Sequence, residues 1–144
     1  MSVVGLLALL VVLLGNGSPD CNCCGSPKPP TIFWSPEGLS FEDVAVGECS
    51  EILSVEIRNT GAVQAGASCP TLTLSCEVSI SAGSDDFVLV SGEQQFTLES
   101  GSSRLVTVQF CPITAGQKTG TLRILHNGGN ADWPIDVPRT GTGN

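Results

Sequence analysis

A strict alternation of apolar and polar residues between positions 72 and 80 constrains the fold of this chain more than any other feature. Leu72, Leu74, Cys76, Val78 and Ile80 alternate there with Thr, Ser and Glu. Successive side chains of an extended chain point to opposite faces, so the pattern predicts a β-strand with one buried and one solvated face. Such a strand needs neighbouring strands and a second layer that covers its apolar face.

The chain after Trp34 repeats this pattern in short segments separated by turn residues, which favours an all-β fold over helices. Seven or eight strands with a turn about every ten residues predict two sheets packed face to face. Between the last two strands, Asn127-Gly128-Gly129 is expected to form a tight hairpin turn with positive backbone φ angles. The expected strands are 39–41, 52–57, 72–80, 87–90, 95–98, 105–110, 122–125 and 135–137.

Several short pieces of this region have an order and spacing that are specific when taken together. They are Gly38-Leu39-Ser40-Phe41, VEIRNTG at 55–61, VTVQFCP at 106–112, Gly120-Thr121-Leu122 and the closing Gly141-Thr142-Gly143. Over residues 36 to 143 the chain resembles the ASH or hydin-like modules and the related choice-of-anchor D domains. The resemblance implies an immunoglobulin-like β-sandwich, akin to the major sperm protein and pilus-chaperone type, that docks in large assemblies and shares no catalytic residues. The chain departs from the family pattern in an insertion at 65–70 and in its cysteines.

Residues 3–14 form an unbroken run of apolar residues and glycine. As a helix, twelve residues span about 18 Å, which is short of the roughly 30 Å hydrocarbon core of a bilayer. One interpretation is a secretory signal cleaved after Gly17, although no Lys or Arg precedes Lys28. The other is a retained, helical hydrophobic arm that packs into a larger assembly. The chain is therefore divided into this signal or arm at 1–17, a Cys/Pro-rich linker at 18–35, and a β-sandwich at 36–144.

The seven cysteines exceed what a reduced cytosolic domain of this size usually carries, and they predict an oxidising destination. Because seven is odd, at least one thiol must stay free or bond outside the chain. Four cysteines lie in the predicted sandwich, where three pairings are possible. The candidates for these internal disulfides are Cys49, Cys69, Cys76 and Cys111.

A second group of cysteines occupies three of four successive positions in the linker. Cysteines this close in sequence bridge one another only with strain, so bonds to other chains or to the sandwich are expected. Proline residues that follow the group stiffen the linker. The candidates for cysteines that join subunits are Cys21, Cys23 and Cys24.

The formal net charge of −8 limits the possible partners. An acidic surface repels phosphate backbones and anionic lipid headgroups, so nucleic acid is not an expected partner. Membrane contact is expected only through residues 1–17, if they are retained. The expected partners are other protein subunits, in a homo-oligomer or a larger assembly.

No combination of residues in the sequence predicts catalysis, a cofactor or a metal. The single histidine, His126, is interpreted as an exposed hairpin residue, because it precedes a turn sequence. Asp85 and Asp86 are interpreted as turn residues, because adjacent carboxylates lack the spacing of a calcium loop. Trp34 and Trp133 are expected to plug the core or its edge rather than to serve as exposed anchors. An enzyme is therefore not expected.

These observations predict a non-enzymatic structural or docking subunit of an extracellular assembly, such as a virion decoration, cement or tail protein. One alternative is an exported bacterial surface or adhesion protein with a cleaved signal peptide. Another is a carbohydrate- or peptide-binding module, which would need exposed aromatic side chains. The expected location is extracellular or on a virion surface, reached by export if residues 1–17 are a signal peptide.

Overall fold

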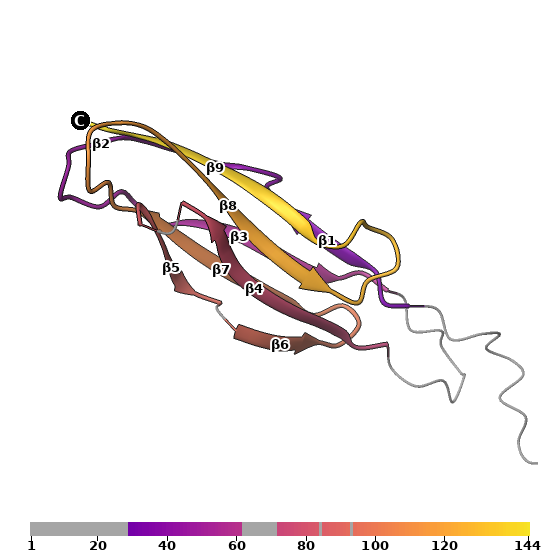
Figure 1. Ribbon diagram of the computed structural model, residues 1–144. Coiled ribbons are helices and arrows are strands. Elements are labelled where there is room, and N and C mark those ends of the chain that lie inside the picture. Colours follow the sequence, from indigo (N-terminus) through magenta and orange to yellow (C-terminus); the bar gives the residue numbers. More distant parts are fainter. Residues whose placement is uncertain (1–28, 62–71, 84, 93) are drawn as a thin grey trace, which may run out of the picture.

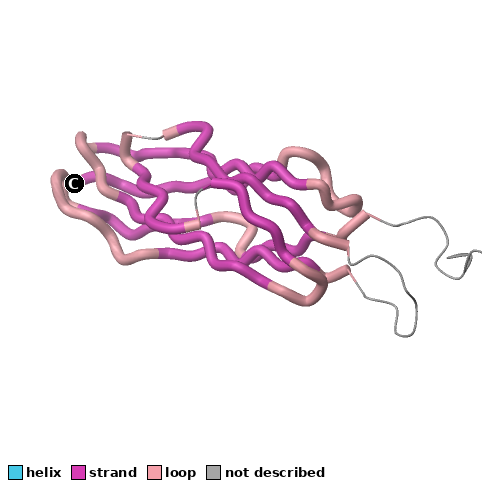
Figure 2. The backbone as a smooth tube through the Cα atoms, turned by 90° about the horizontal axis from the view of Figure 1, so that it is seen from below, coloured by secondary structure: helices cyan, strands magenta, loops and turns pink. Residues whose placement is uncertain are grey.

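The computed structural model describes residues 29–61, 72–83, 85–92 and 94–144, and these form two facing β-sheets without a helix (Figures 1 and 2). Sheet A has the strand order β1 (Ile32–Ser35), β3 (Leu53–Asn59), β7 (Ser103–Phe110) and β5 (Phe87–Ser91). Sheet B has the order β2 (Leu39–Val44), β9 (Ile135–Gly143), β8 (Gly116–His126), β4 (Leu74–Ala82) and β6 (Gln94–Leu98). The predicted all-β sandwich is confirmed, with nine strands in the described part. The arm predicted at 1–17 lies outside the described residues.

The core is the space between the two sheets, and it is filled from both sides by alternate residues of the strands. Val55 and Val106 of sheet A and Leu122 of sheet B are fully buried. Each such side chain stabilises the fold by about 1.5–3 kcal/mol through burial. At one end of the core three phenylalanine rings pack together, with centroids 4.9–5.8 Å apart; they belong to Phe41, Phe87 and Phe110. The core therefore depends on side chains that are far apart in the sequence.

Strands β8 and β9 are much longer than the segments predicted at 122–125 and 135–137. Their paired register runs from Gly116 opposite Gly143 to Ile124 opposite Ile135. Gly120 and Gly141 occupy inner positions of this hairpin, where they interrupt the apolar pattern. Phe110 explains one of them, since a Cβ on Gly141 would lie 2.7 Å from its ring. Close packing, and not hydrophobic pattern, therefore places these residues on the inner face.

Strand β1 lies in the segment that was predicted as linker, and it was not predicted as a strand. It is antiparallel to β3, with Ile32 opposite Asn59 and Trp34 opposite Ile57. Ile32 is only 1% exposed, and Trp34 packs against the core. The described sandwich thus begins before residue 36. With four residues the strand is too short to show a clear alternation.

A fully buried arginine, Arg139, lies on the inner face of sheet B. Its Nη2 atom donates to the carbonyl oxygens of Ala82 and Thr121 at 3.0 and 2.8 Å, and its guanidinium lies 4.7 Å from the centre of the Phe87 ring. Burial lowers the pKa of Arg139 to about 10, so the group stays charged at neutral pH. Gly120 makes room for it, since a Cβ there would lie 3.1 Å from Nη2.

Nothing in the part of the chain that the structure describes is a helix long and apolar enough to cross a membrane.

Candidate functional site

The outer face of sheet A carries a group of exposed apolar side chains, which we call the sheet A face. Large apolar side chains exposed on one face make it a candidate interaction site, and polar residues of the neighbouring strands lie between them. Alternation along β1, β5 and β7 points three of them away from the core, and the fourth lies one residue before β3. They are Phe33 (46% exposed), Ile52 (52%), Val88 (45%) and Leu105 (56%).

The same face has almost no charge. Glu56 and Arg58 are the charged side chains that point outward from the described strands of sheet A, and they form an ion pair at 3.3 Å. Arg104 of β7 points the other way, toward sheet B, and stacks on the ring of Phe96 at 4.7 Å. The sheet A face is therefore neutral, although the chain as a whole has a net charge of −8.

A second exposed feature is the loop that joins β8 to β9 at 127–134, which we call the 127–134 loop. It replaces the predicted tight turn, and neither Gly128 nor Gly129 has a positive φ angle. The side chain of His126 makes two hydrogen bonds with the backbone of this loop. Its Nδ1 atom accepts from the Gly128 N–H and its Nε2 atom bonds the Asp132 carbonyl oxygen, both at 3.0 Å. The prediction of an exposed His126 is wrong, since the side chain is 8% exposed.

Two asparagines fix the same loop to its neighbours. The side chain of Asn127 accepts from the Ser75 N–H at 2.8 Å and donates to the Thr73 carbonyl oxygen at 3.2 Å. The side chain of Asn130 makes two hydrogen bonds with the backbone of Ile32, at 2.8 and 2.9 Å, and so takes the place of a strand beside β1. The loop is therefore tied to both sheets.

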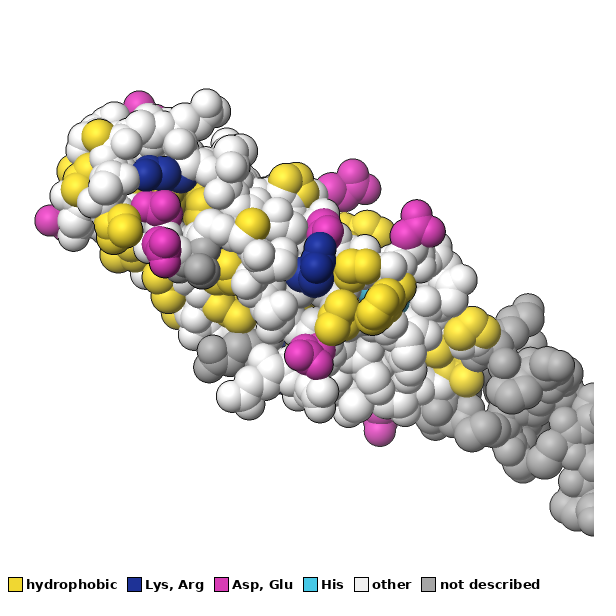
Figure 3. Space-filling model, viewed as in Figure 1, with side chains coloured by type: hydrophobic (Ala, Val, Ile, Leu, Met, Phe, Trp, Pro, Cys, Tyr) yellow, Lys and Arg dark blue, Asp and Glu magenta, His cyan; other side chains and the backbone are white. Residues whose placement is uncertain are grey.

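The 127–134 loop presents Trp133 to solvent at 65% exposure, so the prediction of a plug at the core or its edge is wrong for this residue. Open grooves lie on both sides of the loop. One, of about 580 Å³, is lined by Trp34, Asn130 and Asp136 among others. The other, of about 500 Å³, lies over the outer face of sheet B and includes Glu77 and Trp133. Figure 3 shows apolar side chains gathered beside the histidine on this side of the molecule.

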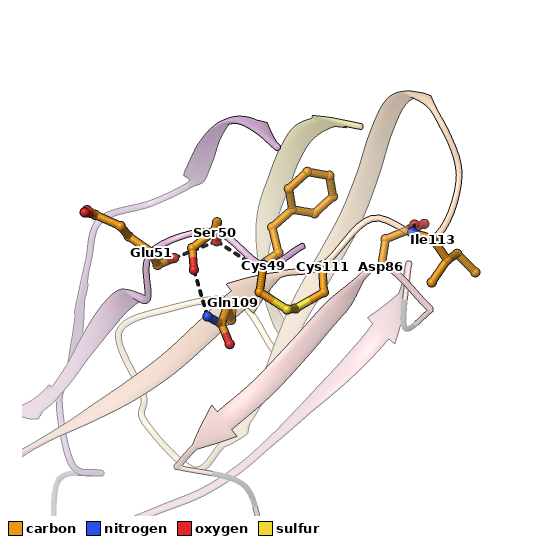
Figure 4. The surroundings of a disulfide bond; sticks show 8 residues. Cys49, Ser50, Glu51, Asp86, Gln109, Cys111 and Ile113 are labelled. Atoms are coloured by element: carbon orange, nitrogen blue, oxygen red, sulfur yellow. Dashed lines mark hydrogen bonds between the residues drawn. A yellow bond between two sulfur atoms is a disulfide. The ribbon is translucent and has the colours of Figure 1, made fainter. Parts of the chain in front are cut away.

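A disulfide bond joins Cys49 and Cys111 at the opposite end of the sandwich from this loop (Figure 4). It links the segment that precedes β3 to the residue that follows β7. Beside it, the Ser50 side chain accepts from the Phe110 N–H at 3.0 Å, and the Gln109 side chain donates to the Ser50 carbonyl oxygen at 2.7 Å. The disulfide therefore reinforces a junction between the two central strands of sheet A that is already hydrogen-bonded.

Of the other candidate cysteines, only Cys76 lies within the described residues. It is a free thiol on the inner face of β4, with 3% exposure. Burial raises the pKa of Cys76 to about 11, so the thiol stays neutral and unreactive near pH 7. Cys69 and the predicted intersubunit residues Cys21, Cys23 and Cys24 lie outside the described residues.

His126 is poorly placed for chemistry, because both of its ring nitrogens are occupied by backbone groups. A catalytic base or a metal ligand needs a free nitrogen. Within 29–61, 72–83, 85–92 and 94–144, no three His, Cys, Asp or Glu side chains are grouped as a metal site would need.

No protein-family model and no curated protein matches the sequence. Solved structures do match the fold. An ASH/PapD-like domain of human CEP192, PapD-like domain 7, aligns with a TM-score of 0.62 and 16% identity, over 100% of this chain and 96% of that domain. A Porphyromonas gingivalis protein of unknown function aligns at 0.59 with 16% identity, over 80% of this chain and 47% of that one.

A third match is the CsuC–CsuE complex of chaperone and tip adhesion subunit from Acinetobacter baumannii. Its TM-score is 0.52 at 9% identity, over 79% of this chain and 52% of the other. The protein therefore has the ASH-like, PapD-like form of the immunoglobulin-like fold. The expectation from the sequence resemblance is confirmed at the level of the fold.

Proposed function

We propose that the protein is a non-enzymatic docking subunit that associates with further copies of itself through the sheet A face. The observation that carries the proposal is the exposure of Phe33, Ile52, Val88 and Leu105 on one neutral face of an acidic chain. Covering these side chains removes apolar surface from water at about 25 cal/mol per Å². Association is therefore favoured at this face.

We take a second copy as the partner, because two neutral faces can meet without local repulsion between like charges. Two chains that each carry −8 repel one another wherever their acidic surfaces meet. The sheet A face avoids this repulsion, because Glu56 and Arg58 already neutralise each other. In a face-to-face pair, these two residues can also exchange partners between the copies. A strongly charged partner would find no complementary charge on this face.

The size of the face indicates a weak contact. The strands of sheet A have 4, 7, 8 and 5 residues. At a strand spacing of about 4.8 Å and a rise of about 3.3 Å per residue they cover roughly 380 Å² on each copy, or about 760 Å² in total. This lies below the approximately 1,200 Å² of a stable interface. Cys21, Cys23 and Cys24 would supply the additional strength as disulfide bonds between subunits, with the weak contact setting the geometry.

The location that we propose is extracellular or on a virion surface. The Cys49–Cys111 disulfide supports an oxidising environment. A virion decoration, cement or tail subunit fits a small acidic sandwich with an attached arm. The alternative is an exported bacterial surface or adhesion protein. Mass spectrometry of the mature chain separates the two: a chain that starts at Ser18 supports export, and an intact Met1 supports a retained arm.

The solved structures of the same fold support a binding role rather than a catalytic one. One of them is a PapD-like domain, and another is a chaperone in complex with a pilus tip adhesion subunit. The chaperone complex is thus an example of this fold binding another protein.

The test is sedimentation velocity of the full chain at increasing concentration, with and without reductant. We expect self-association that weakens at least tenfold in the F33S/L105S variant. The matched control is I113S, which removes an exposed apolar side chain (62% exposed) from the loop between β7 and β8, outside the sheet A face. A wild-type chain that stays monomeric at high concentration, or equal weakening by both variants, would overturn the proposal.

A further inference from the structure

Trp133 lies outside the sheet A face, so self-association through that face does not explain its exposure. It is the most exposed of the large apolar side chains in the described part of the chain. The loop that carries it is held by His126, Asn127 and Asn130, so the indole is displayed on a fixed support. An indole that is displayed in this way gives a flat, apolar surface at little cost in conformational entropy when it binds.

The groove beside this indole has the size of a small-molecule site. Its volume is about 500 Å³, within the range of about 300–1,000 Å³ that ligand sites occupy. The strands β4, β6 and β8 form its floor, so an occupant meets the face of sheet B. Leu125 and Trp133 supply the apolar part of the lining, and Ser75, Glu77, Gln95 and Thr97 supply the polar part.

The polar side chains keep hydrogen-bonding capacity for a ligand. Gln95 Nε2 donates to Glu77 Oε2 at 3.0 Å, which leaves the second carboxylate oxygen of Glu77 and the amide oxygen of Gln95 available. On the next row of the sheet, Ser75 lies opposite Thr97, and each carries a hydroxyl. Donors and acceptors thus lie within two rows of one flat face, beside the indole.

Charge decides which class of ligand fits. The residues that line the groove include the Glu77 carboxylate and no Lys or Arg, so phosphates, sulfates and uronic acids are repelled. Strand β6 is an edge strand of sheet B and borders the groove, so an extended peptide is the competing ligand. The groove itself lies over the face of the sheet and offers side chains. A neutral sugar ring has an apolar C–H face and a rim of hydroxyl groups, which matches an indole beside polar side chains.

We infer that the groove between Trp133 and the Glu77–Gln95 pair is a binding site for a neutral oligosaccharide. The inference is independent of self-association, because the site lies on sheet B and the docking face on sheet A. Sugar rings would stack on Trp133 and hydrogen-bond through their hydroxyl groups to Glu77 and its neighbours. The fixed loop means that the site is formed before the ligand arrives.

The test is a titration of the full chain with defined oligosaccharides, followed by indole fluorescence and by calorimetry. The probes are the hexasaccharides of maltose, cellulose and chitin types, with a hexagalacturonate as the anionic control and hexalysine as a basic peptide. We expect at least one neutral hexasaccharide to bind, with a shift of the indole emission, and the anionic probe not to bind.

Variants locate the binding. The affinity should fall at least tenfold in W133A and at least threefold in E77Q, and should be unchanged in W34F and in L105S. Because Trp133 is exposed, W133A should keep the circular dichroism spectrum of the wild type. The inference is overturned if none of the neutral probes binds, if W133A binds as well as the wild type, or if hexalysine is the only ligand. Retained binding in L105S separates this result from any failure of the docking proposal.

Discussion

The imidazole of His126 and the backbone carbonyl oxygen of Asp132 are joined by a hydrogen bond of 3.0 Å. The Gly128 N–H donates to the other ring nitrogen, so the proton on the ring must sit on Nε2. One side chain thereby connects Gly128 and Asp132 of the 127–134 loop to the end of β8. Trp133 follows Asp132 directly, and its position depends on this bond.

Replacement of His126 by alanine should release the loop. We expect the free energy of unfolding to fall by about 1–3 kcal/mol, because the Gly128 N–H and the Asp132 carbonyl lose their partner. The indole of Trp133 should also become more mobile. Time-resolved fluorescence anisotropy in a W34F background, which leaves Trp133 as the only reporter, measures this directly. An anisotropy decay that H126A leaves unchanged would show that the loop is held by its asparagines alone.

Removal of the Cys49–Cys111 disulfide should cost more than any single hydrogen bond. The bond closes a loop with a sequence separation of 62, for which the chain-entropy model gives about 4 kcal/mol. Urea unfolding of the C49A/C111A variant should show a loss of that order. The same measurement on the wild type with reductant should approach that of the variant with reductant. Equal stability of the oxidised wild type and the variant contradicts this assignment.

Cys76 should make the fold sensitive to alkaline pH. Its pKa is about 11 in the fold against 9.0 for the ordinary thiol, so the unfolded chain loses the proton first as the pH rises. The stability of the fold is therefore little affected by this group below pH 9 and falls above it, by about 1 kcal/mol at pH 10. Burial lowers the pKa of Arg139 to about 10, so the titration of this group acts in the opposite sense and offsets part of the loss near pH 10.

Urea unfolding at pH 8, 9 and 10 measures this effect, with C76A as the control. The variant is expected to be less stable throughout, because a cavity replaces the sulfur, but its stability should be flatter across the window. In the folded wild type, Cys76 should also resist alkylation at pH 8 until denaturant is added. Parallel pH profiles for the two proteins, or rapid alkylation of native Cys76, would count against a buried neutral thiol.

Asn59 is the last residue of β3, and its side chain is buried. Replacing its amide by a carboxylate tests the role of the amide hydrogen bonds. Its Nδ2 donates to the carbonyl oxygens of Leu72 and Leu98, at 2.8 and 3.0 Å. In N59D a carboxylate would face both oxygens, so we expect a loss of at least about 3 kcal/mol in the free energy of unfolding. The control is N127D, where an exposed amide donates to one carbonyl, and a loss of about 1 kcal/mol is expected. Similar losses in both variants would mean that burial of Asn59 does not matter.

Much of the sandwich follows from the sequence alone, because its inner positions are apolar. The alternation at 72–80 predicts the centre of β4, and Val106, Val108 and Phe110 predict β7. The ends of β8 and β9 could not be predicted in this way, because Gly120, Arg139 and Gly141 occupy inner positions there. Their burial depends on contacts with side chains from other strands, such as Phe87 and Phe110, that no local pattern contains.

The surfaces were harder to predict than the core. His126 precedes two glycines, which indicates an exposed turn, yet the loop folds back over its ring. Trp133 is large and apolar, which favours burial, yet the same loop turns it outward. Exposure of a single side chain is decided by how the loop is tied to strands far away in sequence. Alternation alone does not say which face of a strand is solvent-exposed. Phe33 and Leu105 can be placed on the outer face only when their strands are known to belong to sheet A.

The central claim is that copies of this chain meet through the sheet A face, and photo-crosslinking tests it most directly. A benzophenone amino acid would replace Leu105 in the purified full chain, and in a second variant it would replace Thr121 on the outer face of sheet B. After irradiation under reducing conditions, mass spectrometry should find crosslinks from position 105 to β1, β3 or β7 of another copy, and few from position 121. Crosslinks between copies that are absent from position 105, or equally frequent from position 121, would contradict the account.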